Sequence, residues 1–372
     1  MNNKTTFLTF NESVNGVYIS QVIEVVNYYQ ELGISTNIIA FFSIRDFLKN
    51  RKLLKHYLPN SIVLPSIGRI KHWKWNGLWL KLFSKELKGQ TIICRGALAT
   101  NLAIDHLNKS KIVYDGRGAI WAEQLEYGVF NGTGIENNLF DIEKKAVLRS
   151  QGRIAVSSQL VDYWCKNFGY KDHNHVIIPC TLSIKKELTD NNVPDNLNKF
   201  LNDHQDGVIC VFSGGNGKWQ QLDKVCSFAE NIVGKQGNIA FLFLSPTSPE
   251  ISKLIEKFPD RIFNTLIKPK LIITVLKKCD YGIVLREKNT TNRVASPVKI
   301  AEYLYAGLKV IISPNVGDYS ELITANNFGY IHNEQYCENL SKPSTADKNK
   351  IHLFAELSLT KSAFEKKFLL LT

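Results

Sequence analysis

The stretch from Ser296 to Gly307 combines residue types that suit an anion site at the start of a helix. Ser296 is predicted to cap the helix, Pro297 suits the first helical position, and Gly307 suits the C-terminal cap. Amides at a helix start favour a phosphate group. Lys299 in the first turn opposes the helix dipole unless an anion is bound there. The predicted donor-phosphate site therefore comprises Ser296, Pro297, Val298 and Lys299.

Glu302 follows Lys299 by three positions and so lies on a nearby face of the same predicted helix. A carboxylate one turn into the helix can accept hydrogen bonds from ribose hydroxyls, so Glu302 is predicted to bind the donor. The alternative is an ordinary capped helix that carries an exposed Lys–Glu pair.

A glycine-rich loop follows the predicted strand 208–212. Gly214 and Gly215 allow the backbone to approach a diphosphate closely, and Lys218 can neutralise its charge. The loop lacks the Gly-Lys-Ser or Gly-Lys-Thr ending of a P-loop. Its place after the first strand of a second α/β region favours a donor-phosphate role. A plain tight turn is the alternative.

Three further loops that follow predicted strands carry candidate site residues, and ligands of doubly wound sheets bind in such loops. Arg286 is expected to contact the phosphates or sugar of a donor, and the family resemblance described below implies the same for Gly16. Asp115 and Arg117, flanked by glycines, are expected to be catalytic together with Lys218. The alternatives are a surface turn at Gly16, a buried structural pair of Asp115 and Arg117, and a solvated charged loop at Arg286.

Basic residues and tryptophans interleave over residues 69–83. Aromatic rings at the headgroup level and lysines toward anionic lipid are typical of an interfacial segment. We expect this segment to contact a membrane surface or a lipid-linked acceptor. A tryptophan-rich core helix with exposed lysines is the alternative. The predicted contact residues are Trp73, Lys74, Trp75 and Trp79.

Parallel strands are needed to position these loops, and short β-branched runs do alternate with longer amphipathic stretches. Such alternation predicts βαβ units. The polar stretch 181–205 is predicted to be a linker between two doubly wound α/β domains, 1–180 and 206–354. Residues 355–371 are predicted to form a final helix that packs back on the first domain. Strands are expected at 5–10, 36–40, 61–64, 91–94, 111–114, 153–157, 176–178, 208–212, 239–244, 261–263, 281–285 and 310–313.

The stretch Ser296–Gly307, with Val310–Ser313 and Gly317–Glu321 after it, resembles the donor-site region of GT-B fold glycosyltransferases. The group that it resembles most is family 4, the retaining transferases of bacterial surface glycan synthesis. The resemblance implies two Rossmann-like domains that face each other across a cleft. It implies a UDP- or GDP-linked sugar as donor, no other cofactor, and a glycan or lipid-linked acceptor bound on the N-terminal side.

The resemblance also implies individual roles. Glu302 would bind the nucleotide ribose, and amides at Ser296–Lys299 would face the pyrophosphate. These amides, together with Lys218 and Arg286, would stabilise the leaving diphosphate without a metal. The leaving phosphate would itself accept the proton of the acceptor.

The sequence departs from the family pattern at three places. Gly215 stands where an Arg is usual, Val294 stands where many members carry a second glutamate, and no His lies near Asp115. The resemblance implies that Asp115 and Arg117 replace this His. Whether Glu287 replaces the missing glutamate stays open.

The composition narrows the class of protein. The chain has 372 residues and a formal net charge of +12, which suits nucleic acid, an anionic membrane face or phosphorylated substrates. Seven cysteines without a CxxC pair indicate reduced thiols, and the N-terminus shows no secretory signal. We expect a cytoplasmic protein that binds peripherally at the inner face of the membrane. The sequence shows no spacing typical of metal ligands.

Three other functions compete with glycosyl transfer. A nucleotide-sugar 2-epimerase would share the fold but needs acid–base carboxylates and histidines in the cleft, which the sequence does not offer. A transferase-like scaffold subunit without activity fits the departures at Val294 and near Asp115. A nucleic-acid-binding module is suggested by charge alone, and the loops at strand ends argue against it.

Overall fold

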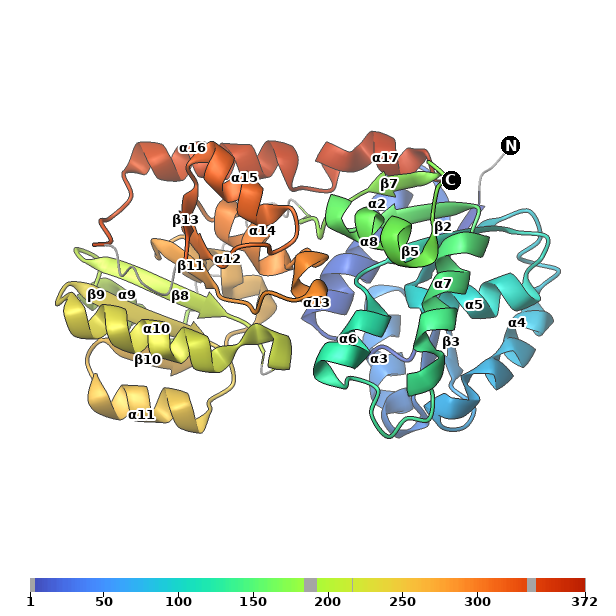
Figure 1. The fold of residues 1–372 in the computed structure, drawn as a ribbon, viewed down its shortest axis with the longest axis horizontal. Coiled ribbons are helices and arrows are strands. Elements are labelled where there is room, and N and C mark those ends of the chain that lie inside the picture. The colour runs from blue at the N-terminus through green and yellow to red at the C-terminus, as the bar shows by residue number, and fades with distance from the viewer. Residues whose placement is uncertain (1–3, 184–192, 216, 333–338, 372) are drawn as a thin grey trace. The chain divides into compact units, whose positions relative to one another are not determined.

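The computed structural model describes residues 4–183, 193–215, 217–332 and 339–371. The contacts within the chain divide it into two compact units. Unit 1 comprises Met1–Ser183, Arg293–Ser296 and Phe364–Thr372, and unit 2 comprises Ile184–Asn292 and Pro297–Ala363. Each unit is built around one parallel β-sheet with helices against it (Figure 1).

The sheet of unit 1 has seven strands in the order β3-β2-β1-β4-β5-β6-β7, and neighbouring strands pair in parallel. The chain runs outward from β1 to β3 and then returns to the other side of β1 at β4. The carboxyl ends of β1 and β4 therefore form a switch point, where ligands of such sheets bind. The strands are β1 (Lys4–Phe10), β2 (Ser35–Phe42), β3 (Ile62–Pro65), β4 (Thr91–Arg95), β5 (Lys111–Gly116), β6 (Gly152–Ala155) and β7 (His175–Ile177).

Helices cover both faces of this sheet, because successive side chains of a strand point to opposite faces. Phe7 and Ile38 pack in one hydrophobic cluster, and Leu8 and Ile39 pack in the other. The first cluster contains residues of α1 (Gly16–Tyr18), η1 (Ile19–Ile23), α2 (Glu24–Glu31), α3 (Phe47–Tyr57) and α17 (Glu365–Leu369). The second contains residues of η3 (Ile70–Asn76), α4 (Gly77–Phe83), α5 (Gly96–His106), α6 (Ile120–Tyr127), α7 (Leu139–Arg149) and α8 (Ser158–Phe168). Short helical turns lie at η2 (Ile44–Asp46) and η4 (Glu136–Asn138).

The sheet of unit 2 has six strands in the order β10-β9-β8-β11-β12-β13, and its neighbouring strands are also parallel. Its switch point lies between β8 and β11. The strands are β8 (Val208–Ser213), β9 (Ile239–Leu244), β10 (Ile262–Thr265), β11 (Tyr281–Val284), β12 (Lys309–Ile312) and β13 (Gly329–Ile331). The helices are α9 (Asp195–Asp203), η5 (Lys218–Gln220), α10 (Leu222–Lys235), α11 (Pro249–Lys257), η6 (Pro269–Leu271), α12 (Ile272–Leu276), α13 (Thr290–Arg293), α14 (Val298–Tyr305), α15 (Tyr319–Asn326), α16 (Thr345–Ser358) and η7 (Ser362–Phe364).

Two doubly wound parallel α/β units are the fold class that the sequence predicts, and the structure confirms it. Strand β13 was not predicted, because it is only three residues long and carries a single β-branched residue. Part of the stretch predicted as linker is helical, because α9 lies at 195–203 and buries Leu197, Phe200 and Leu201. Residues 184–192 of the predicted linker lie outside the described residues.

The single helix predicted at 355–371 is wrong. Helix α16 begins ten residues earlier, at Thr345, where Ser344 and Asp347 form a capping box, and it ends at Ser358. Helix α17 begins at Glu365 and belongs to unit 1. There the Tyr29 hydroxyl donates to the Phe368 carbonyl over 3.2 Å, and the two rings meet edge to face.

Candidate functional site

The glycine loop after β8 lies against the first turn of α14. A Cβ atom at Gly214 would come 2.6 Å from the Lys299 ammonium and 3.1 Å from the Phe212 ring, so only glycine leaves room for this approach. The Ser213 amide donates to the Tyr303 hydroxyl over 2.8 Å, which fixes the loop to the same helix. At Gly215, by contrast, an added Cβ would meet open space.

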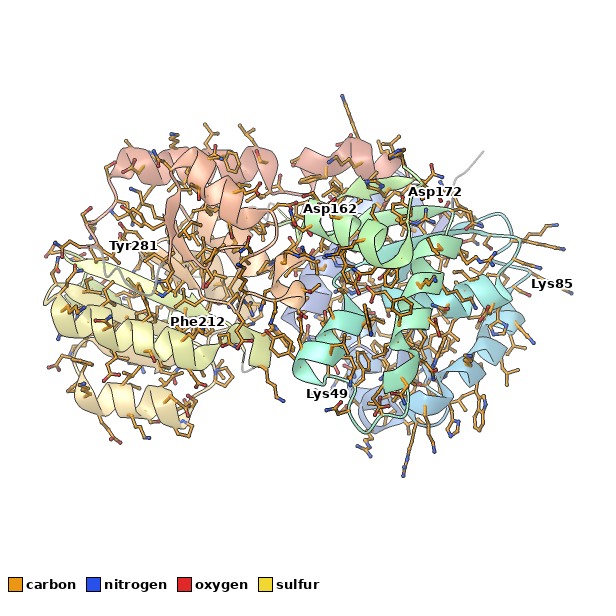
Figure 2. All side chains as sticks on the ribbon, viewed as in Figure 1. Lys49, Lys85, Asp162, Asp172, Phe212 and Tyr281 are labelled. Carbon is orange, nitrogen blue, oxygen red and sulfur yellow. The ribbon has the colours of Figure 1, made fainter. Side chains whose placement is uncertain are left out.

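Lys299 is the central cation of this site. Its side chain is only 7% exposed, and its Nζ lies 4.3 Å from the centre of the Phe212 ring, which belongs to β8 (Figure 2). The ammonium donates to Gln220 Oε1 over 2.7 Å. Burial, and then the nearby Arg286 guanidinium, lower the pKa of Lys299 well below its ordinary value, while Glu302 opposes this shift. A buried lysine whose hydrogen-bond acceptor is a neutral amide suits a site for an anionic ligand.

Arg286 brings a second cation to the same place. It follows β11, is 6% exposed, and its backbone amide donates to Ser313 Oγ over 2.9 Å. Its Nη1 donates to the Trp219 carbonyl. The solvated charged loop that was the alternative for Arg286 is therefore wrong, because this side chain is buried. Lys218, in contrast, is exposed.

The start of α14 differs from the predicted one. The helix begins at Val298, and Pro297 takes the N-cap position with φ −66° and ψ 117°, outside the helical region. Ser296 does not cap the helix: its Oγ accepts the Cys180 amide over 3.0 Å within unit 1. Gly307 has φ +82° and follows the C-cap residue, as the sequence predicts.

Glu302 is partly exposed, whereas Val294, at the position where many family members carry a second glutamate, is buried. Glu302 lies on α14 one turn after Lys299 and is partly exposed. Val294 is fully buried in the core of unit 1. A glutamate there would be buried as well, so the valine serves packing. Glu287 is partly exposed, and its backbone carbonyl accepts the Asn292 side-chain amide over 3.2 Å.

The polar residues predicted in unit 1 belong to a buried charge network. Asp115 lies 3.3 Å from Arg117 Nη1 and 3.7 Å from Nη1 of Arg95, the last residue of β4. Arg95 also pairs with Glu12 over 2.8 Å. Burial opposes the charged form of Arg95, yet Glu12 and Asp115 raise its pKa above the ordinary value. The predicted pair of Asp115 and Arg117 is therefore part of a network with two cations and two carboxylates.

Arg117 reaches beyond this network. Its Nη2 donates to Gln21 Oε1 over 3.0 Å and contacts Cys180 Sγ at 3.1 Å. A cavity of about 20 Å³ borders this side chain, which is room for about one water molecule. The cavity is lined by Phe7, Gln21, Val25, Tyr29, Asp115, Arg117, Ile154, Ile178, Pro179, Thr181 and Phe368.

Gly16 opens α1 immediately after the helix cap at Asn15, whose side chain accepts the Tyr18 amide over 3.0 Å. Gly16 is exposed, and a Cβ there would meet nothing within 4 Å. Steric demand within unit 1 therefore does not explain the glycine.

The tryptophan-rich segment forms η3 and α4 of unit 1. Trp73 is only 3% exposed and lies in the core, so its predicted membrane contact is wrong. Trp79 is partly buried against the same core. Trp75 is 55% exposed and stacks on His72 with ring centres 4.4 Å apart. Lys74 holds its ammonium 5.9 Å from the Trp73 ring.

Sequence reasoning missed several residues of both sites. Arg95 follows a buried strand, so the strand-end rule that found Asp115 would also have found it. Gln220 and Tyr303 are neutral, and no sequence signal marks their contacts with Lys299 and Ser213.

Among the described residues, no helix is long and apolar enough to cross a membrane. No group of three or more His, Cys, Asp or Glu residues in the described parts of the chain is arranged to hold a metal ion.

Comparisons with known proteins find similarity at the level of structure. No protein-family model matches the sequence, and no curated protein matches it. A point mutant of S. aureus TarM, in complex with fondaparinux, α-GlcNAc-glycerol and UDP, has a TM-score of 0.64 and 12% identity, covering 99% of both chains. A glycosyltransferase from Rickettsia africae has a TM-score of 0.63 and 17% identity, covering 100% of this chain and 94% of its own.

A third similar structure is a putative UDP-N-acetylglucosamine 2-epimerase from Listeria monocytogenes. Its TM-score is 0.57 at 10% identity, covering 100% of this chain and 91% of its own. At such identities the comparisons establish a shared fold over the whole chain: the two-unit fold of glycosyltransferase structures.

Proposed function

We propose that the protein is a glycosyltransferase that uses a nucleotide-diphosphate sugar as donor. One observation carries this proposal. Lys299, a buried cation at the switch point of unit 2, donates to the neutral amide oxygen of Gln220 beside a glycine loop, and the buried guanidinium of Arg286 lies nearby. A diphosphate bound there would provide the negative charge that favours a buried ammonium. UDP in the complex of the structurally similar S. aureus TarM mutant supports the choice of ligand.

The proposed chemistry follows from these charges. The bond between the anomeric carbon and the diphosphate oxygen breaks, a bond to the acceptor oxygen forms, and the acceptor proton passes to the leaving phosphate. Charge on the diphosphate grows as its bond breaks, so fixed cations stabilise the transition state more than the ground state. Lys299 and Arg286 are the proposed electrostatic stabilisers, and exposed Lys218 is proposed to join them when the donor binds. Retention of the anomeric configuration is proposed from the resemblance to family 4.

Glu302 is the proposed ribose ligand, because it is partly exposed one turn after Lys299 on the same helix. The backbone N–H groups of Val298 and Lys299 at the start of α14 are proposed to face the diphosphate together with the glycine loop, whereas Pro297 has no N–H to donate. Ser296 is left out of the proposed ligand set, because its hydroxyl is already an acceptor for Cys180.

In unit 1 we propose that Asp115 and Arg117 orient the acceptor or the transferred sugar, with Gly16 in the loop after β1. Their place supports this, since Asp115 lies near the end of β5, while Glu12 follows β1 and Arg95 is the last residue of β4 at the switch point. The network holds Arg117 by one side, through Asp115 and Gln21, and so fixes its guanidinium.

The acceptor is proposed to be a glycan or a lipid-linked sugar of bacterial surface polysaccharide, at the inner membrane face. Exposed Trp75, Leu78 and Leu82 on η3 and α4 support contact with lipid, with exposed lysines such as Lys85 beside them in sequence (Figure 2). Such apolar side chains gain free energy in the headgroup region, and lysines favour anionic lipid.

Incubation with tritiated UDP-, GDP- and dTDP-sugars tests the proposed reaction. Slow release of free sugar supports a transferase, because water then replaces the missing acceptor. Inversion at C2 of the sugar would instead identify an epimerase. The similar structure from Listeria monocytogenes carries the name of such an enzyme. Nucleotide binding without turnover would indicate an inactive scaffold subunit, and no nucleotide binding would rule out both the transferase and the epimerase.

Flotation with anionic vesicles tests the membrane contact. The double variant Trp75→Ala/Leu82→Ala is expected to reduce binding at least tenfold, because two exposed apolar side chains are lost. Leu357→Ala, which shortens an equally exposed side chain on α16 of unit 2, is the matched control and should bind as the wild type does. Equal binding of all three proteins would refute the contact.

A further inference from the structure

The turn η5 contacts both buried cations of unit 2 through consecutive residues. Gln220 Oε1 accepts a hydrogen bond from Lys299 Nζ over 2.7 Å, and the Trp219 carbonyl accepts one from Arg286 Nη1. The acceptor of Lys299 is the oxygen atom of a neutral amide group. It lies beside the ammonium, where an oxygen atom of a diphosphate could also bind.

The contact between Lys299 and Gln220 is weaker than one that a diphosphate would make. A neutral amide accepts a hydrogen bond from the buried ammonium but does not balance its charge, whereas a phosphate oxygen does both. Lys299 and Arg286 also repel each other, which adds to the lowering of the pKa of Lys299. An anion that contacts both cations would relieve this repulsion, so it has an energetic advantage over Gln220.

The turn is short and lies between two elements whose residues are anchored in the core of unit 2. It is three residues long, follows Gly217, and ends at Gln221, which has φ +50°. Trp219 is 41% exposed and packs over Gly217, where a Cβ would come 2.7 Å from the indole ring. The strand β8 and the helix α10 on either side are held by their own cores.

We propose that Gln220 competes with the donor for Lys299, and that the donor diphosphate displaces the Gln220 side chain from Lys299. The displaced turn then carries Trp219 to a new environment. This inference rests on the proposed function of the same site and specifies which contact the donor replaces.

Two substitutions at Gln220 separate displacement from direct binding. Gln220→Ala removes the competing acceptor, so UDP and inorganic pyrophosphate are expected to bind about fivefold more tightly, the value of one ordinary hydrogen bond. Gln220→Glu places a carboxylate beside Lys299, so both ligands should bind at least tenfold more weakly. If Gln220 instead contacts the diphosphate itself, Gln220→Ala weakens binding, and this result would overturn the inference.

The neighbouring Gln221 offers a matched control. Its side chain donates to the Lys218 carbonyl over 3.0 Å, a contact within the turn itself. Gln221→Ala should leave the affinity for UDP and pyrophosphate unchanged. An equal gain in affinity from Gln221→Ala would mean that any loosening of the turn suffices, and would refute the specific role of Gln220.

Fluorescence supplies a second measurement that does not depend on the Gln220 variants. Trp219 is the only tryptophan of unit 2. Saturating UDP should change the emission of the wild type, and Trp219→Phe should abolish the change, whereas Trp75→Phe should preserve it. UDP binding without a Trp219 signal overturns the displacement alone. If calorimetry detects binding of neither UDP, GDP nor pyrophosphate by the wild type, the proposed function fails and this inference fails with it.

Discussion

Tyr303 and Ser213 join helix α14 to the glycine loop through one buried hydrogen bond, in which the Ser213 amide donates to the Tyr303 hydroxyl over 2.8 Å. The Tyr303 ring lies against β11, where a Cβ at Gly282 would come 2.2 Å from it. One tyrosine therefore sets the spacing between the loop that carries Gly214 and the helix that carries Lys299. This spacing decides whether both can contact one diphosphate.

Tyr303→Phe is expected to lower the free energy of unfolding by about 1–3 kcal/mol, because the buried Ser213 amide loses its acceptor. The affinity for UDP should fall about fivefold or more, since the loop is no longer fixed to α14. Chemical denaturation and calorimetry measure the two effects.

Tyr281→Phe provides the control for this experiment. It removes a hydroxyl that donates to the Ser341 carbonyl over 2.8 Å on another side of unit 2. This variant should lose stability to a similar extent and keep its affinity for UDP. If Tyr303→Phe also keeps its affinity, the proposed link between loop and helix is wrong.

Lys299→Met should make nucleotide binding at least tenfold weaker, because a charge-assisted hydrogen bond is lost. Without ligand, the same variant should be more stable than the wild type at neutral pH, since a buried charge is replaced by a hydrophobic side chain. Lys253→Met, which changes an exposed lysine of α11, should alter neither property.

The stability difference between Lys299→Met and the wild type should depend on pH. Burial and Arg286 lower the pKa of Lys299 in the folded state below its ordinary value of 10.5. The unfolded chain thus binds a proton that the folded chain has released, so wild-type stability rises relative to the variant as pH approaches about 10. Thermal unfolding between pH 6 and 10, in steps of about one unit, measures this effect. A constant difference would mean that Lys299 keeps an ordinary pKa.

The sequence was informative where residue type alone determines the role. Runs of buried β-branched residues marked the strands, and the chemistry of Gly214, Lys299 and Arg286 marked the loops at their ends. The sequence was uninformative where a contact with a distant part of the chain determines the role of a residue. Ser296 looks like a helix cap, yet its hydroxyl accepts an amide 116 residues away in the chain.

Which tryptophans of the segment 69–83 are buried could not be predicted from the sequence either. Trp73 and Trp75 are two positions apart in a basic sequence and look equivalent. In η3, Trp73 turns into the core that also contains residues of α4 and α5, whereas Trp75 stacks on His72 at the surface. A short irregular helix lacks the regular period from which an inward face can be predicted.

The stability of unit 1 is expected to depend on pH through Glu143. It is fully buried on α7, and its Oε2 accepts the Trp121 amide of α6 over 3.0 Å. Burial raises the pKa of Glu143 to about 8, with Glu123 adding to the shift. The protonated form thus stabilises the folded state, and this contribution is lost as pH rises from about 4.5 to above 8.

Glu143→Gln keeps an acceptor for Trp121 and removes the titration. Near pH 5 the variant should match the wild type, and near pH 9 it should be more stable, by an amount on the order of 2–4 kcal/mol. Glu136→Gln changes a partly exposed carboxylate of η4 whose pKa is lowered by hydrogen bonds from backbone amides, so it should not show this pattern. Parallel pH profiles of wild type and Glu143→Gln would contradict the assignment.

The charge network of unit 1 is expected to contribute both to stability and to sugar transfer. Asp115→Asn removes one carboxylate from between Arg95 and Arg117, so Arg117 loses its ion pair and Glu12 alone faces the two guanidinium groups. The loss of stability should reach about 3–5 kcal/mol, against less than about 1 kcal/mol for Asp105→Asn, which breaks an exposed ion pair with Lys145. UDP affinity should stay as in the wild type, because Asp115 belongs to unit 1, while sugar transfer falls sharply. A variant that loses UDP affinity in proportion to activity would place Asp115 among the donor ligands instead.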